Sequence, residues 1–467
     1  MRPGKGRKKD LTKGPILKTL FVLAAPLVFG MSLHTAFNVI DTFFIGMLGS
    51  EHLAAISITF PVVFIFIAIA SGLAIGSTAL VSQAIGSGNR KKASNLASHS
   101  IIIGAAAGIA VAVTGFFFAP PLFSFMGVSG ETLAMTIEYA NLIFLGFVFM
   151  FIFFITQGLI QADGDTITPT INLSISIILN IILDPIFIFG LGPVPAMGLF
   201  GAALATVLTR TIGSVMNLIH ILRGRTGLRI GGKNFKFDPA IFKRIFMVGM
   251  PSSISNSINS VGMILMMSLV GLFGTPALAA FGVGLRLESL AIMPVIGLSF
   301  AIMPFIGQNL GAGKISRAEK SMKYASYAVI LFMLIFSVIW FLIPHILLSP
   351  FSSDPEVLAI GTTFFRIISL GYVFLGINFI LGSSMQAAGR TGLQLIVNGG
   401  RWILTVVFAF ALVGTVGING IWMGIPLGNF VGMLMALFFI KSGIWLRKWK
   451  KPGDEPGSVG KIFKRGG

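Results

Sequence analysis

Two polar stripes in otherwise apolar segments carry the residues of this chain that could do chemistry. His34, Asn38 and Asp41 recur at i, i+4 and i+7, the spacing that places side chains on one face of a helix. A second stripe recurs every four residues and consists of Asn172, Ser176, Asn180 and Asp184. If the two helices belong to one bundle, two carboxylates and several carboxamides meet in surroundings of low polarity.

Such a pair of acids is expected to respond to a small cation. Two carboxylates held close together at low polarity strongly disfavour the doubly ionised form, so the cluster holds one proton or binds Na+. We therefore expect Asp41 and Asp184, with Asn180, to couple to H+ or to form a Na+ site, and we favour H+ because acids so close should share a proton. The alternative is a hydrogen-bonded polar core that only orients two helices.

Several other chemistries lack the residues that they need. The chain has no cysteine, which excludes disulfides, thiolate metal sites and cysteine nucleophiles, and its five histidines are too scattered for a histidine metal site. No phosphate-binding loop of the form GxxxxGK[ST] is present. An intramembrane aspartyl protease could use two acids, but it would not explain a repeat along the whole chain. We expect no enzyme and no cofactor other than the coupling ion.

The elements that must position these residues are membrane-spanning helices. Of the 467 residues, 55% are hydrophobic and 10% are charged, against about 25% charged in soluble domains, and the mean hydropathy is +0.93. Apolar runs long enough to cross a bilayer predict twelve helices and an all-α integral membrane protein. Their ranges are 15–46, 53–86, 94–119, 131–161, 167–190, 197–222, 240–272, 277–309, 317–345, 356–387, 392–414 and 419–444.

The basic residues predict the orientation of these helices. All but four of the 34 lysines and arginines lie in the N-terminal tail, the even-numbered connections, the C-terminal tail or the turns of the spans that adjoin them. Because positive residues concentrate on the cytoplasmic side, both termini are predicted to be cytoplasmic in a multi-pass protein of the cell membrane. The net charge of +19 then reflects topology and attraction to lipid headgroups rather than nucleic-acid binding.

The second half of the chain repeats the first at one constant offset. Met250-Pro251 matches Ala25-Pro26, and the glutamines and glycines of 83–88 and 161–166 recur at 308–313 and 386–391. Six spans per repeat predict two lobes related by a pseudo-two-fold axis along the membrane normal. The predicted parts are a basic cytoplasmic tail (1–14), an N-lobe (15–222), a cytoplasmic linker (223–239), a C-lobe (240–445) and a second basic cytoplasmic tail (446–467).

The offset also separates the lobes chemically. It places Met266 opposite Asp41, and it places Ala409 opposite Asp184, or Val406 if the local alignment slips by three residues. Only the N-lobe therefore holds both acids. Because each repeat has its partner within the chain, a monomer is expected.

The candidate substrate-binding residues are those of the two stripes and the adaptable or polar side chains of nearby spans: Met31, His34, Phe37, Asn38, Tyr139, Gln157, Asn172, Ser176, Asn256 and Met263.

In this order, several motifs resemble the multidrug and toxic compound extrusion (MATE) family, specifically its prokaryotic DinF-like branch. They are NVIDTFFIGMLG from Asn38, AIGSG from Ala84, QGLIQADGD from Gln157, NIILDP from Asn180 and GAALAT from Gly201. The resemblance implies a V-shaped pair of lobes in which protonation of the acid matching Asp41 bends the first helix at Pro26. It also adds Thr206 to the coupling network of Asn180 and Asp184. The acids that other branches carry in the second lobe have no counterpart within the seventh and tenth spans.

The function expected on these grounds is export of amphipathic, often cationic drugs by alternating access, driven by entry of H+ rather than Na+. The alternative is a flippase for lipid-linked oligosaccharide or lipid of the same superfamily. That alternative ranks lower because, apart from basic residues in the end turns of the spans, only Arg210, Arg286, Arg366 and Arg401 lie inside the membrane, whereas such proteins often have a strongly cationic cavity.

Overall fold

The computed structural model describes residues 10–230 and 237–449; within the helices, the side chains of 36, 38, 39, 41–43, 50, 51, 53 and 54 lie outside this description. The described residues form helices and turns without a strand, and twelve segments are long and apolar enough to cross a membrane. This confirms the predicted fold class. Because lipid cannot satisfy backbone N–H and C=O groups, a chain this apolar must pair them within helices.

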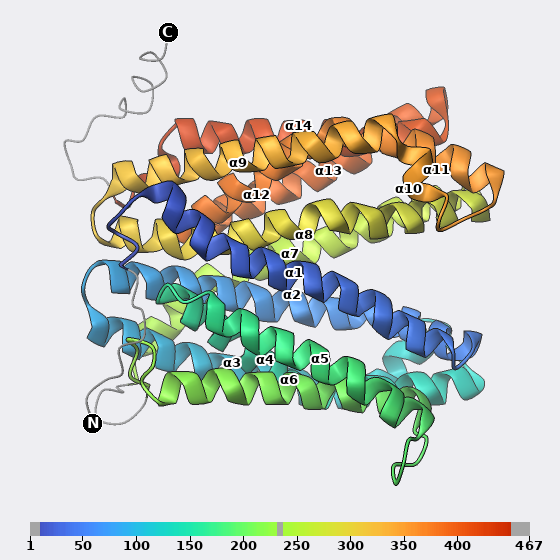
Figure 1. Ribbon diagram of the computed structural model, residues 1–467, viewed down its shortest axis with the longest axis horizontal. Helices are drawn as coiled ribbons and strands as arrows, with labels where there is room; N and C mark the ends of the chain where they lie inside the picture. The colour runs from blue at the N-terminus through green and yellow to red at the C-terminus, as the bar shows by residue number, and fades with distance from the viewer. Residues whose placement is uncertain (1–9, 231–236, 450–467) are drawn as a thin grey trace.

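Six helices form the N-lobe. Their bounds are α1 Ile16–Gly46, α2 Ser50–Gly86, α3 Arg90–Phe125, α4 Gly130–Ala162, α5 Ile167–Phe189 and α6 Gly198–Leu222. All six match predicted spans to within a few residues, except that α3 extends further at both ends than the predicted 94–119. Successive helices run in opposite directions along the long axis of the molecule (Figure 1).

The C-lobe repeats this arrangement with one break. Its helices are α7 Pro239–Gly271, α8 Thr275–Gly311, α9 Ile315–Leu342, α10 Pro344–Leu348, α11 Pro355–Ile368, α12 Tyr372–Ala387, α13 Thr391–Val416 and α14 Ile418–Lys441. The predicted span 356–387 is α11 and α12 joined by the 3-10 turn Ser369–Gly371. The exact tail, lobe and linker boundaries drawn from the sequence stay predictions.

The two lobes meet through the helices that begin each repeat: α1 lies against α8, and α2 lies against α7 (Figure 1). A Cβ on Gly297 of α8 would lie 2.8 Å from the backbone N of Val28 on α1. Its counterpart in the first repeat, Gly72 of α2, makes the equivalent close approach to Ser253 of α7. The repeats therefore pack reciprocally, as a two-fold interface requires.

The lobes also pair at the end where α2 and α8 finish. The side-chain Nε2 of Gln83 donates to the carbonyl of Ala387 (2.7 Å), and the Nε2 of Gln308 donates to the carbonyl of Ala162 (2.8 Å). Both bonds cross between lobes, and each is the counterpart of the other in the repeat. We call these two bonds the glutamine latch. The repeated motifs recognised in the sequence are thus the ones that join the lobes.

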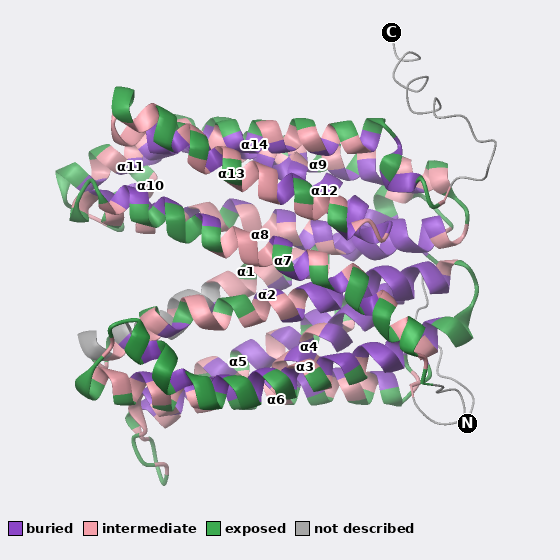
Figure 2. Ribbon diagram, turned by 180° about the vertical axis from the view of Figure 1, so that it is seen from behind, coloured by how far each residue is buried: buried purple, intermediate pink, exposed green. Residues whose placement is uncertain are grey.

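The distribution of buried residues follows the contact between the two lobes. Buried residues concentrate where the lobes meet, and exposed residues lie along the outer surfaces (Figure 2). Large apolar side chains are among those exposed, Phe21 by 74% and Phe117 by 70%, as expected for surfaces that face lipid rather than water. From the latch end the ribbons of the two lobes diverge toward the opposite end (Figures 1 and 2).

Candidate functional site

Asp184 is buried in the interior of the N-lobe. It lies on α5, and its side chain has no exposed surface. Asn180, one turn earlier, is 2% exposed and donates from Nδ2 to Asp184 Oδ1 at 3.0 Å. A buried carboxyl needs hydrogen-bond partners, and the carboxamide supplies one from the same helix face. The second stripe therefore brings two of its coupling candidates into direct contact.

The first stripe lies on α1, which is helical throughout, but the side chains of Asn38 and Asp41 lie outside the described residues. Their neighbours show how α1 meets α5. One turn before Asp41, Phe37 shares an apolar cluster with Leu173 and Ile177 of α5. One turn after it, Ile45 shares another with Ile188 of α5. Contacts between α1 and α5 thus bracket the level of Asp41.

The first two residues of the α5 stripe, Asn172 and Ser176, lie where α5 packs against α6. Asn172 donates from Nδ2 to Asn217 Oδ1 at 2.7 Å, and the Ser176 hydroxyl donates to the Asn172 carbonyl at 3.0 Å. Both stripe residues are more than nine-tenths buried. These two candidate substrate-binding residues therefore take part in hydrogen bonds within the lobe.

The same packing sets the register of α6 against α5. Gly213 approaches Ser176, and Gly201 approaches the backbone of Phe187 and Ile188. Because the helices are antiparallel, this register places Thr206 level with Asp184. Among the described residues the Thr206 side chain makes no hydrogen bond; its carbonyl accepts one from the Thr209 hydroxyl at 3.1 Å.

His34 has a partner that the sequence alone did not indicate. Nη2 of Arg210 on α6 lies 3.5 Å from His34 Nε2, and the Arg210 guanidinium lies 5.7 Å from the centre of the Phe153 ring. The His34 and Phe37 rings meet edge to face at 6.1 Å. The N-lobe interior therefore contains a cation with an imidazole and aromatic rings beside it, close to the α5 stripe.

The remaining substrate candidates are scattered. Met31 on α1 is half-buried, and Gln157 on α4 is 9% exposed. Tyr139 on α4 packs at the edge of the cluster that contains Ile45 and Ile188.

The two candidates on α7 also lie apart. Asn256 donates from Nδ2 to the Ser71 hydroxyl of α2 at 3.4 Å, so it lies at the contact between lobes. Met263 is 38% exposed.

Pro26 lies inside α1, which passes through it without a break. A proline inside a helix removes one backbone hydrogen bond and weakens the helix there. The next turn carries Leu27 and Val28, whose backbone meets Gly297 of α8. The weak point of α1 is therefore beside its closest contact with the other lobe.

The C-lobe contains a polar cluster around Arg401 of α13. Its guanidinium donates to the side-chain oxygens of Asn398 (3.1 and 3.2 Å), Asn429 (3.1 Å) and Asn259 (3.0 Å), and it stacks at 4.6 Å from the centre of the Trp402 ring. Among the described residues no carboxylate forms an ion pair with it.

The sequence suggests only that Arg401 snorkels or pairs internally, and it assigns this arginine no site role. The signal that could have found the cluster is the repeat: Asn259 is the counterpart of His34, and Arg401 is the counterpart of Ser176. In each lobe, therefore, an arginine contacts the first helix of that lobe at the same register.

No group of three or more His, Cys, Asp or Glu that could hold a metal ion occurs among the described residues. The Na+ alternative requires Asp41, whose side chain is not described, so it stays a prediction together with the H+ alternative.

A family model described as MatE matches the chain twice, over residues 26–186 and 251–411. The two matches begin at Pro26 and Pro251, which are the prolines that the internal repeat aligns. Among curated proteins, a protein named FAD transporter from Shewanella oneidensis is 30% identical over 94% of this chain and 97% of its own length. A multidrug export protein named MepA from Staphylococcus haemolyticus is 26% identical over 91% of this chain and 94% of its own.

Solved structures agree with these relatives. The structure titled as the outward-facing conformation of a multidrug resistance MATE family transporter of the MOP superfamily superposes with a TM-score of 0.90 at 27% identity. It covers 96% of this chain and 100% of that chain.

Proposed function

The chain belongs to the MatE family of multidrug and toxic compound extrusion transporters, and from this premise we propose that it exports amphipathic, often cationic drugs in exchange for H+. Members of the family are transporters rather than enzymes, and they need no cofactor. The finer part of the proposal is that Asp41 and Asp184 of the N-lobe take up the coupling ion. We favour H+ over Na+ because two acids held close together are expected to share a proton.

The contacts on either side of Asp41 carry the proposal. Phe37 shares a cluster with Ile177, and Ile45 shares one with Ile188; both α5 partners are one to two turns from Asp184. Because α1 and α5 run in the same direction and have the same rise per residue, Asp41 and Asp184 are expected at one level. Residues four apart share a helix face, so Asp41 is expected on the face of α1 that carries Ile45.

Neutralising this pair changes what the N-lobe can hold. Because the doubly ionised form is disfavoured at low polarity, a bound cation such as the drug must balance the charge of the two acids when both are ionised. One proton lets the two acids share a hydrogen bond, and α1 then relaxes toward α5 about the weak point at Pro26. The pocket beside α1 shrinks, and the drug leaves. Thr206 and Asn180 complete the polar surroundings in this scheme.

The energy available is sufficient for useful export. For a monovalent cationic drug, one-for-one exchange with H+ moves no net charge, so only the pH difference drives it. For an uncharged drug, one proton that crosses about 150 mV releases roughly 3.5 kcal/mol, from about 2.3 kcal/mol per 100 mV. This supports a drug gradient of a few hundred-fold, since each factor of ten requires about 1.4 kcal/mol.

We further propose that the latch end faces the cytoplasm. The described chain at this end holds Arg90, Lys91, Lys92 and the basic residues of α9, as expected for the positive side of a membrane protein. Both termini are then cytoplasmic, the protein lies in the cell membrane, and the conformation with joined lobes at this end is outward-facing. A monomer suffices, because each lobe finds its counterpart within the chain.

The test is uptake of a fluorescent cationic dye into inverted membrane vesicles, first under an imposed pH gradient and then under an imposed Na+ gradient. We expect the pH gradient to drive uptake, and Asp41→Asn and Asp184→Asn each to reduce it at least tenfold while leaving the melting temperature close to that of the wild type. Glu131→Gln is the matched control, because Glu131 is an exposed acid in the first turn of α4. Normal dye uptake by Asp41→Asn would contradict the coupling role.

A second candidate substrate class is an anionic aromatic compound. The observation that favours it is the Arg401 cluster, where a guanidinium stacked on Trp402 has only neutral hydrogen-bond partners among the described residues. A guanidinium donates hydrogen bonds to phosphate oxygens such as those of a flavin nucleotide, and the relative from Shewanella is named a FAD transporter. Competition of FAD with the dye in the same vesicles separates the two classes: inhibition that Arg401→Gln abolishes supports the anionic substrate.

A further inference from the structure

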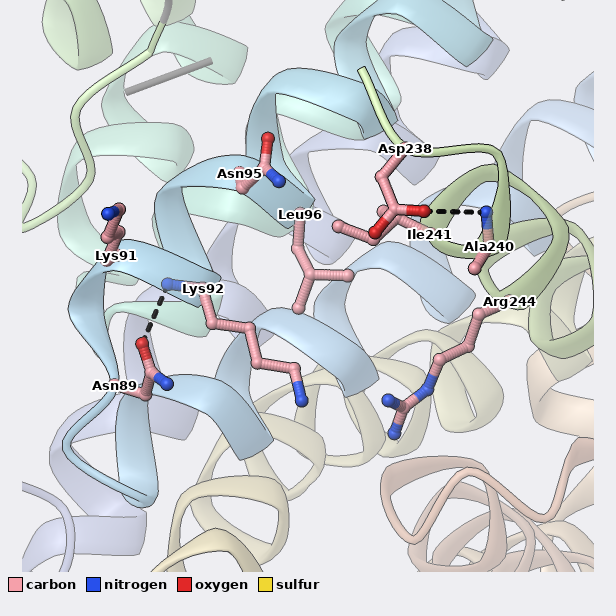
Figure 3. A pocket seen from close by; sticks show the side chains of 9 residues that line it. All are labelled: Asn89, Lys91, Lys92, Asn95, Leu96, Asp238, Ala240, Ile241 and Arg244. Carbon is pink, nitrogen blue, oxygen red and sulfur yellow. Dashed lines mark hydrogen bonds between the residues drawn. The ribbon is translucent and has the colours of Figure 1, made fainter. Parts of the chain in front are cut away.

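A cavity of about 470 Å³ lies at the latch end, between the first turns of α3 and α7. Its wall from the N-lobe includes Lys91 and Lys92, and its wall from the C-lobe includes Arg244 (Figure 3). The apolar side chains Leu96 and Ile241 also line it. The cavity therefore opens between two helices that belong to different lobes.

Its polar lining is mainly positive. The Lys92 and Arg244 side chains both extend into the space between the two helices (Figure 3). Asp238 is the acid among the lining residues, and it caps α7 by accepting from the Ala240 N–H at 2.9 Å. Asn89 caps α3 by accepting from the Lys92 N–H at 2.9 Å. Two helix N-termini, each with a partial positive charge, thus meet at the cavity.

Two more cations lie close to this lining. Burial, followed by the charges of Arg244, Arg390 and Lys92, lowers the pKa of Lys448, which follows α14. Arg390 lies between α12 and α13, and its Nε is buried without a hydrogen-bond partner among the described residues. Four separate segments of the chain therefore bring positive charge to one place.

These four side chains differ from several cations at the same end that bond to other parts of the chain. Within residues 10–230 and 237–449, Lys92, Arg244, Arg390 and Lys448 make no ion pair and no side-chain hydrogen bond. By contrast, Arg90 pairs with Asp163.

Two neighbouring cations, Lys314 before α9 and Arg317 on it, also bond to the chain itself. Lys314 donates to the Thr12 carbonyl at 2.8 Å, and Arg317 donates to the Lys13 carbonyl at 2.8 Å. Against these four cations and Lys91, the described lining offers the single carboxylate of Asp238. Most of the repulsion within the cluster is thus left uncompensated by the described part of the chain.

Hydrogen bonds between α3 and the segment that precedes α7 hold the two helices at this spacing. The linker donates from the Arg229 N–H to the Ser94 hydroxyl at 2.9 Å and from the Asp238 N–H to His99 Nε2 at 2.9 Å. The His99 ring also stacks on Phe237 at 5.8 Å. The cavity is therefore a formed feature of the fold.

We propose that this cavity binds a phosphate-bearing anion, which bridges Lys92 of the N-lobe and Arg244 of the C-lobe and draws in Lys448 and Arg390. Lysine and arginine side chains at helix N-termini are the usual ligands of phosphate. The same chemistry is offered by the headgroup of an anionic phospholipid and by a soluble phosphate. Because the anion contacts both lobes where they meet, it stabilises the conformation in which this end is joined.

The experiment measures binding to the purified full chain in detergent by native mass spectrometry, with two probes: short-chain phosphatidylglycerol and inorganic phosphate. Short-chain phosphatidylcholine, which has no net charge, is the reference lipid. The site variant is Lys92→Gln/Arg244→Gln/Lys448→Gln. The control variant Lys18→Gln/Lys243→Gln/Lys320→Gln removes the same charge from exposed residues that do not line the cavity.

We expect the site variant to bind the anionic probe at least tenfold more weakly than the wild type, and the control variant to bind it as the wild type does. The anionic probe should also raise the unfolding temperature of the wild type but not of the site variant. Phosphatidylglycerol binding that phosphate does not displace identifies a lipid headgroup as the ligand, and binding of phosphate alone identifies a soluble anion.

Equal loss in the site and control variants, or no preference of the wild type for either anionic probe over phosphatidylcholine, would overturn the proposal. Should the triple variant fail to fold, Lys92→Gln and Arg244→Gln are measured singly, and each must weaken binding. This test does not depend on drug transport, so it stands whether or not the coupling scheme holds.

Discussion

At the scale of single residues, Arg401 shows how a charge is accommodated inside a lobe without an ion pair. Three asparagine oxygens accept from its guanidinium, and Asn259 also accepts from the Trp402 indole N–H at 2.7 Å. The arginine thereby joins α7, α13 and α14. Neutral carboxamides satisfy its donors without the cost of desolvating a second charge.

We predict that Arg401→Gln lowers the stability of the C-lobe. The shorter side chain leaves the Asn429 oxygen without its donor and the Asn259 oxygen with only the donor from Trp402. Hydrogen bonds to a charged group are worth about 1.5–3 kcal/mol each. The loss should be measurable as a clear drop in the thermal unfolding temperature of the purified protein. Arg366→Gln is the control, because Arg366 is exposed on α11, and it should change the unfolding temperature little. Equal unfolding temperatures of the two variants would show that the Arg401 cluster does not stabilise the protein.

At the scale of elements, two helices cross where α1 is weakest. Gly297 of α8 lets the helix backbones approach at Val28, just beyond Pro26. Any movement of α1 about its proline therefore takes place against a contact that tolerates no side chain. In the proposed scheme, α1 bends at Pro26 while the contact with α8 supports it.

We predict that Gly297→Ala impairs both stability and transport. The added Cβ would lie 2.8 Å from Val28 N, and overpacking of this kind costs about 1–3 kcal/mol. Gly282→Ala on the same helix meets nothing within 4 Å, so it should be neutral or slightly stabilising, since alanine is the better helix former. The measurements are dye export and the thermal unfolding temperature, each compared between Gly297→Ala and Gly282→Ala. If both variants export dye normally, the close contact is not needed for the movement.

At the scale of the whole molecule, the glutamine latch joins the lobes by two equivalent bonds. Gln83 is 5% exposed and Gln308 is 3% exposed, and each reaches the carbonyl of an alanine in the opposite lobe. In the proposed alternating access, these two bonds break together. The latch therefore contributes to the free-energy difference between the two conformations.

We predict that Gln83→Ala/Gln308→Ala shifts the population away from the joined conformation. Each buried hydrogen bond contributes about 1 kcal/mol, so the two together correspond to a shift of roughly thirtyfold. Because the chain has no cysteine, spin labels at cysteines introduced in place of Ser87 and Ser442 report the distance between lobes at this end. We expect a larger fraction of the double variant than of the wild type to show a long distance between the two labels.

The control for the latch is Gln161→Ala/Gln386→Ala, which removes the other repeated pair of buried glutamines. Those side chains make no hydrogen bond across the lobes among the described residues, so the distance distribution should stay as in the wild type. A shift of equal size in both double variants would mean that helix packing, rather than the latch, sets the equilibrium.

Much of this protein follows from its sequence. The twelve helices and the two repeats could be predicted because hydropathy and the constant offset between the halves are properties of the chain itself, and the polar stripe with Asn180 and Asp184 follows from helical periodicity. Asn172 shows the limit: periodicity places it on the face of Asp184, whereas packing against α6 directs it to Asn217. Only the tertiary structure decided that contact, the Arg401 cluster, the reciprocal latch and the cationic cavity. The physical reason is that each depends on residues far apart in the chain, and their distance is set by how helices pack rather than by any local pattern.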